Sequence, residues 1–105
     1  MNSVTVDINT GDILSGFFVQ YDHGQVINLA GDVPEAYQAE ICNTGSISTS
    51  DLLPIVNNAI SVPDVYLLSG ANLLLYIVLI DEVNRSRNTV CKVEIPVHRR
   101  PAITS

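Results

Sequence analysis

Residues 73–80 read Leu-Leu-Leu-Tyr-Ile-Val-Leu-Ile, and this stretch decides the fold class. A membrane-spanning helix needs about 20 apolar residues, so the run is too short to be one. A short apolar run bounded by turn signals predicts a buried strand, here Leu73 to Asp81. The polar residues Glu82 to Arg87 then predict a hairpin loop, and Asn88 to Ile95 the strand that returns from it.

The rest of the chain reads as further short strands separated by turn signals, which is typical of a β-sandwich or barrel. Residues Asp22-His23-Gly24 predict a hairpin turn, with Gly24 free to take positive φ. The segment 44–58 is rich in Ser, Thr and Asn and predicts a loop with at most one short strand, near residues 50–55. The other expected strands are 3–8, 16–21, 25–29, 37–43 and 59–62.

One segment favours a helical turn, namely Pro63 to Gly70, because Pro suits the first turn and Gly the end of a helix. The predicted fold is therefore all-β, an antiparallel β-sandwich of about seven short strands with one short helical turn. We expect this domain to span residues 1–96. Residues 97–105 are expected to form an extended basic tail, which Pro96 and Pro101 keep out of helical conformation.

Both faces of the 73–80 strand are apolar, whereas a half-exposed strand alternates apolar with polar residues. Alternation places Leu73, Leu75, Ile77 and Leu79 on one face and Leu74, Tyr76, Val78 and Ile80 on the other. One interpretation is a central strand whose second face is capped by the 63–70 turn, or is a tolerated apolar surface. The other is that a partner subunit covers the face of Leu74, since large exposed apolar patches mark interfaces.

Charge is divided unevenly along the chain, whose net charge is −6. Residues 1–84 hold ten acidic side chains and no Lys or Arg, while the five basic residues all lie in 85–100 beside the single acid Glu94. An acidic balance argues against nucleic-acid binding, which needs basic surface. The segregation suggests that Arg85, Arg87, Arg99 and Arg100 dock on an acidic surface, such as that of a neighbouring copy; for Arg99 and Arg100 a frayed terminus is the alternative.

The residues that carry chemistry are few and scattered. His23 lies in a tight turn, and Asp81-Glu82 opens a hairpin loop, so neither predicts a catalytic or metal site. Cys42 and Cys91 are expected on opposite faces of their strands, which predicts two free thiols in a reducing compartment. Met1 to Thr10 has no basic residue and no apolar core, so no signal peptide is expected. We expect no enzyme, cofactor, metal, nucleic acid or membrane partner.

Four segments in order resemble a known group of phage proteins. Residues 19–26 resemble a "YDxGQ" signature, 33–37 an "lPxAYe" step, 61–70 an "IPdxyLxxG" segment, and 90–97 with Arg100-Pro101 a closing "YxVxIPVxxRxxP". Together they resemble the N-terminal modules of accessory virion proteins in phages of Gram-positive bacteria, of the baseplate upper protein and fibre-anchor type. The segment 44–58 is unmatched, and Val90 or Cys91 stands where the motif has Tyr.

The resemblance implies an immunoglobulin-like fold and a structural role in the virion, assembled in the host cytoplasm. Relatives often continue into a fibre, whereas this sequence stops at Ser105, which favours a capsid decoration protein or fibre-anchoring module. A tail or baseplate attachment module is the alternative. A carbohydrate-binding adhesion domain is another, although the chain has no Trp and Tyr66 is the main loop aromatic. The expected partners are capsid or tail proteins and further copies of the chain.

Overall fold

The computed structural model describes residues 3–101, and of these it describes 46–49 by backbone alone. Within this range the chain forms ten β-strands and one 3-10 helix, η1 (Asp64–Leu67), with no α-helix. The strands are β1 (Ser3–Asp7), β2 (Asp12–Ser15), β3 (Phe18–Val19), β4 (Val26–Ala30), β5 (Tyr37–Asn43), β6 (Ser46–Leu53), β7 (Ala59–Ser61), β8 (Leu73–Asp81), β9 (Ser86–Ile95) and β10 (Val97–His98). The all-β class and the single helical turn are confirmed.

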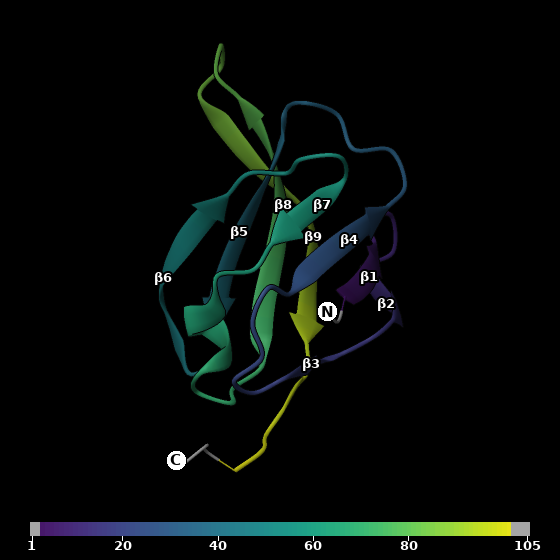
Figure 1. Cartoon of the computed structure of the whole chain (residues 1–105). Helices are drawn as coiled ribbons and strands as arrows, with labels where there is room; N and C mark the ends of the chain where they lie inside the picture. The colour runs from purple at the N-terminus through teal and green to yellow at the C-terminus, as the bar shows by residue number, and fades with distance from the viewer. Residues whose placement is uncertain (1–2, 102–105) are drawn as a thin grey trace.

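The described strands form two four-stranded sheets and one two-stranded ladder (Figure 1). The strand orders are β2-β1-β4-β7, β6-β5-β8-β9 and β10-β3. Most neighbours are antiparallel, but β1 runs parallel to β4 and β3 runs parallel to β10. The prediction of a wholly antiparallel arrangement is therefore wrong at these two pairs. A tight hairpin cannot join parallel strands, so the chain passes from β1 to β4 through β2 and β3.

The hydrophobic core lies between the two four-stranded sheets, because each strand turns alternate apolar side chains inward. From the first sheet and the turn that follows β1 the buried cluster takes Val4, Val6, Ile8, Ile27, Leu29 and Ile60. From the second it takes Ala39, Ile41, Leu73, Leu75, Ile77, Val93 and Ile95. Burial of a side chain of this size contributes about 1.5–3 kcal/mol, so this shared cluster is the main force that holds the two sheets together.

The apolar stretch at 73–80 forms the interior strand β8, with β5 on one side and β9 on the other. Its predicted bounds are confirmed. The turn at residues 82–85 leads directly into β9, so the predicted hairpin is also confirmed. Figure 1 shows this hairpin extending beyond the two sheets, at the opposite end of the molecule from β3.

The predicted hairpin at Asp22-His23-Gly24 is wrong. The expected strand 16–21 is only β3, which pairs with β10, while β4 pairs with β1 and β7. Contacts distant in sequence decide this corner: the Tyr21 N–H donates to Leu67 O at 3.1 Å, and the Gly24 N–H donates to the Asp64 carboxylate at 3.1 Å. Turn chemistry alone does not reveal such contacts.

The segment 44–58 is mostly strand, where a loop with at most one short strand was predicted. β6 spans Ser46–Leu53 and pairs with β5 as a hairpin. Ser and Thr weaken the local strand signal, but the open edge of β5 offers a ladder of backbone partners. The predicted tail also begins inside the fold, because β10 pairs with β3 and Val97 is buried.

Candidate assembly surfaces

The outer face of β8 carries four of the predicted interface residues: Leu74, Tyr76, Val78 and Ile80. All four lie outside the core cluster. Leu74 is only 7% exposed and Val78 only 2%, whereas Tyr76 and Ile80 are partly exposed. Leu74 and Val78 therefore present little surface to any partner, and Tyr76 and Ile80 remain available.

Charged side chains of the neighbouring strands extend across this apolar stripe. Arg87 on β9 lies 2.7 Å from the Glu40 carboxylate on β5, and the strand register places Val78 of β8 between them. Lys92 Nζ lies over the Tyr76 ring, 5.9 Å from its centroid. Long basic side chains cover apolar surface with their methylene stems while the charge stays in water. The doubly apolar strand is thus largely covered within one chain.

The β8–β9 hairpin carries the most exposed apolar side chain of the described chain. β5 pairs with β8 as far as Leu79, and the Ile80 N–H still donates to Ala36 O; beyond Ile80 the described chain gives the hairpin no further backbone partner on that side. Val83 at the turn is 91% exposed. The turn itself is ordered by Asp81, whose carboxylate accepts hydrogen bonds from the Asn84 side chain at 2.8 Å and from two backbone N–H groups, which lowers the pKa of Asp81.

The predicted basic residues do not form one continuous arm. Arg85 and Arg87 lie at the hairpin, and Arg85 makes no ion pair or hydrogen bond with any other described residue. Arg99 and Arg100 follow β10, which pairs with β3 at the other end of the molecule (Figure 1). The structure therefore brings Ile80, Arg85 and Arg87 together and leaves Arg99 and Arg100 apart from them.

Arg99 and Arg100 bind to their own chain. Arg100 Nε donates to Gln20 O at 2.6 Å, and its guanidinium lies 3.5 Å from the Asp22 carboxylate. Arg99 Nε donates to Gly70 O at 3.5 Å. The opposite charges noted in the sequence thus meet within one molecule at this end, where they attach the C-terminal segment to the fold.

The "YDxGQ" segment forms a structural corner in which two glutamines are buried. Gln20 donates its side-chain amide to Leu68 O at 2.9 Å and accepts the Arg100 N–H at 3.2 Å. His23 is exposed, and its Nδ1 lies 2.9 Å from Asp64. This hydrogen bond, with that of the Gly24 N–H, lowers the pKa of Asp64. The corner joins β3, η1 and the C-terminal segment.

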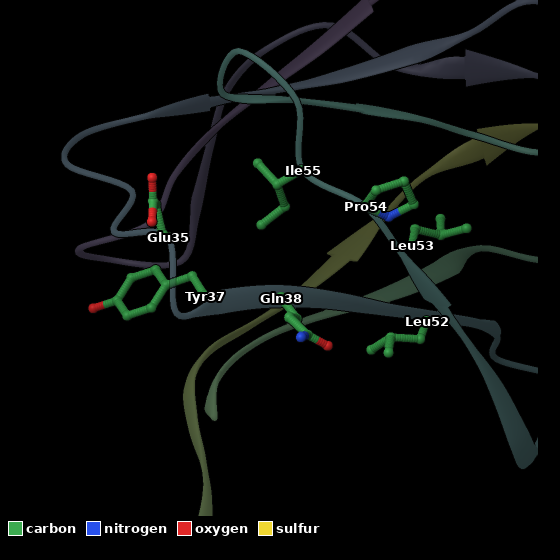
Figure 2. A pocket seen from close by; sticks show the side chains of 7 residues that line it. All are labelled: Glu35, Tyr37, Gln38, Leu52, Leu53, Pro54 and Ile55. Carbon is green, nitrogen blue, oxygen red and sulfur yellow. The ribbon is translucent and has the colours of Figure 1, made fainter. Parts of the chain in front are cut away.

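A pocket of about 410 Å³ lies beside the base of the hairpin, where the sequence predicted no site. β6 ends opposite Ala39, and Pro54 carries the chain away, so the first two residues of β5 have no β6 neighbour. Figure 2 shows the side chains that line the gap: Glu35, Tyr37, Gln38, Leu52, Leu53, Pro54 and Ile55. The only hint of this site in the sequence is Pro54 after Leu52 and Leu53. A proline there predicts the end of a strand but does not predict a cavity.

The pocket is lined by apolar side chains and by the polar side chains of Glu35 and Gln38, which Figure 2 shows on opposite sides of β5. The Gln38 side-chain oxygen is buried without a hydrogen-bond partner among the described residues. Glu35 is exposed, and its carboxylate forms no ion pair or hydrogen bond with the described residues. An acceptor left unpaired in a buried position costs free energy, whereas the Glu35 carboxylate is open to a donor from outside the chain.

Tyr66, the aromatic residue considered for carbohydrate binding, is engaged within the chain. It packs against the core, and its hydroxyl donates to the Asp51 carboxylate. Burial, followed by this hydrogen bond, raises the pKa of Tyr66 to about 12. Its ring therefore offers no open platform for a sugar.

Cys42 and Cys91 lie on opposite faces, which confirms the predicted directions of their side chains. Cys91 packs against the core, and Cys42 is buried on the outer face. Burial raises the pKa of both thiols. Over residues 3–101, excluding the side chains of 46–49, no three or more His, Cys, Asp or Glu residues gather as a metal site. No helix in the described part of the chain has the length and apolar character to cross a membrane.

No family model, curated protein or solved structure matches this chain.

Proposed function

We propose that this protein is a non-enzymatic structural component of a phage particle, a capsid decoration protein or a fibre-anchoring module. The order of the four sequence segments supports the phage setting. The structural observation that carries the assembly role is the β8–β9 hairpin, which extends beyond both sheets and exposes Val83. Val83 and the partly exposed Tyr76 and Ile80 of the same hairpin are apolar side chains that this projection leaves available to a partner.

We further propose that the two packed sheets are an immunoglobulin-like sandwich. The single hydrophobic core shared by β1, β4 and β7 with β5, β8 and β9 supports this arrangement. The strand order in an experimental structure tests it. A sheet order other than β2-β1-β4-β7 facing β6-β5-β8-β9 would count against it.

The test of the phage role is the composition of purified particles. Quantitative mass spectrometry of virions, normalised to the major capsid protein, is expected to detect this protein as a stoichiometric component. Hundreds of copies per particle indicate the capsid, and a few to some tens indicate the tail or baseplate, the alternative location. Absence from particles purified through a density gradient contradicts the proposal.

A carbohydrate-binding adhesion domain is the second candidate, and the pocket beside Tyr37 is the observation that favours it. An aromatic ring beside a carboxylate and an amide can contact both the apolar face and the hydroxyls of a sugar. Binding to a glycan array, lost in Tyr37→Ala and retained in Tyr66→Phe, would support this role. A glycan array without binding would contradict the carbohydrate-binding role.

A further inference from the structure

The pocket lies near the base of the β8–β9 hairpin, and the hairpin tip projects away from it. The Ile80 N–H donates to Ala36 O at 3.2 Å, which places the strand leading to the tip beside the segment that holds Glu35. The tip lies about four residues beyond this point, roughly 13 Å along a strand. It extends away from the body, as Figure 1 shows, so it leaves the pocket of its own chain open.

The chemistry of the tip complements that of the pocket. The tip offers an exposed apolar side chain, Val83, and a cation, Arg85, that has no partner among the described residues. The pocket offers apolar side chains together with the exposed Glu35 carboxylate. A guanidinium carries five donors in a planar fork that suits a carboxylate.

We propose that two copies of this chain clasp each other, with the hairpin tip of each copy seated in the pocket of the other. Val83 then contacts the apolar side chains of the pocket, and Arg85 pairs with the exposed Glu35 carboxylate. Because pocket and tip lie at the two ends of one short hairpin arm, two arms laid side by side in opposite directions satisfy both contacts. A two-fold axis relates them, and the assembly closes as a dimer.

A second copy fits better than an unrelated acidic or basic partner because of the charge pattern. The body of the chain is acidic, so two bodies repel in general. The hairpin is where the sequence changes from acidic to basic, at Glu82 and Arg85. Attraction between copies is therefore concentrated where a tip meets a pocket, and this sets the orientation of the pair.

The clasp rests on the proposed assembly role, but it is tested on the isolated protein. Sedimentation velocity from low micromolar to about 1 mM is expected to show a monomer–dimer equilibrium. Val83→Asp and Arg85→Glu are each expected to weaken dimerisation at least about tenfold, as central interface residues do. Val65→Asp changes an equally apolar, exposed side chain in η1, away from the hairpin, and is expected to leave dimerisation unchanged.

A charge exchange gives the decisive experiment. Glu35→Arg and Arg85→Glu are each expected to be monomeric alone, because residues 35 and 85 then carry like charges at both contacts between a tip and a pocket. A mixture of the two variants is expected to dimerise as wild type does. In the mixed dimer, residues 35 and 85 carry opposite charges at both contacts between a tip and a pocket. Circular dichroism of each variant confirms that it is folded.

Three results would overturn the clasp. The first is a wild type that stays monomeric throughout the concentration range. The second is a mixture of the two charge variants that remains monomeric although both are folded. The third is a series of species larger than a dimer, which would mean that tips and pockets join head to tail. None of these bears on whether the protein is found in virions, which tests the proposed function separately.

Discussion

The Arg87 guanidinium on β9 and the Glu40 carboxylate on β5 meet at 2.7 Å across the outer face of β8, with Val78 between them. Glu40 is mostly buried and Arg87 is largely exposed. The pair therefore has two effects: it links the two strands that flank β8, and its side chains cover an apolar residue that would otherwise face water.

Arg87→Ala is expected to remove this cover at small thermodynamic cost. Because Glu40 is mostly buried while Arg87 is exposed, urea denaturation should show a loss at the upper end of the range for surface ion pairs, about 1 kcal/mol. Binding of a hydrophobic dye to the folded protein should increase, because Val78 becomes exposed. Arg85→Ala, compared in protein dilute enough for the proposed dimer to be dissociated, is the matched control, since Arg85 has no partner among the described residues of its own chain; an equal rise in dye binding there would contradict the covering role.

Leu74→Asp and Tyr76→Asp are expected to behave differently although both lie on the outer face of β8. Leu74 is buried, so a carboxylate there should lower the free energy of unfolding by at least about 3 kcal/mol. Tyr76 is partly exposed, and its substitution should cost about 1 kcal/mol. Chemical denaturation of both variants measures the difference. Equal losses of unfolding free energy would mean that Leu74 and Tyr76 are equally exposed, or equally buried, on the outer face.

Gly70→Ala is expected to destabilise the attachment of the C-terminal segment. Gly70 has a φ of +71°, and an added Cβ would lie 2.9 Å from Arg99 and 3.1 Å from Gln20. Gly24 has a φ of +68° with open space around the added atom, so Gly24→Ala isolates the backbone cost, about 1 kcal/mol. The Gly70 variant should lose at least about 1 kcal/mol more. Thermal unfolding of the two variants at matched pH measures both losses of stability. Identical losses would show that the side chains of Arg99 and Gln20 move away from the added Cβ at no cost.

Asp64 is expected to titrate below its ordinary pKa of 3.8, because His23 and the Gly24 N–H donate to its ionised form. A lowered folded-state pKa means that the carboxylate stabilises the fold above the ordinary value. That contribution is lost as the pH falls through the lowered pKa. Carboxyl-detected NMR should show that His23→Ala raises the pKa of Asp64.

The control for this titration is Asp81, whose pKa is also lowered but by Asn84. His23→Ala should leave the pKa of Asp81 unchanged. If Asp64 titrates identically in wild type and His23→Ala, then the hydrogen bond from His23 is not what favours its ionised form.

How far the sequence predicted the structure depends on whether a segment carries its own signal. The alternation in Val4 and Val6, and the unbroken apolar run at 73–80, predicted their strands because burial on defined faces requires those patterns. β6 was missed because its polar residues become a strand only through the open edge of β5. The corner at residues 22–24 was misread because its hydrogen bonds reach Asp64 and Leu67, which no local pattern reveals.

The same division holds for the candidate surfaces. Alternation alone determined that Leu74, Tyr76, Val78 and Ile80 share a face, but it could not show that Arg87 and Lys92 cover part of it. It also could not separate Arg85 from Arg99, because β9 carries the chain from one end of the molecule to the other. The pocket beside Glu35 arises where β6 leaves β5, which is a property of the strand register.

By itself, therefore, the sequence determined the all-β class, the hairpin at 73–95 and the separation of acidic from basic residues. These follow from the period of the apolar side chains and from simple order along the chain. Tertiary structure alone decided the parallel pairing of β1 with β4, the cover over the outer face of β8 and the juxtaposition of the Glu35 pocket with the hairpin. Each of these depends on contacts between residues far apart in sequence, which alternation along one strand cannot encode.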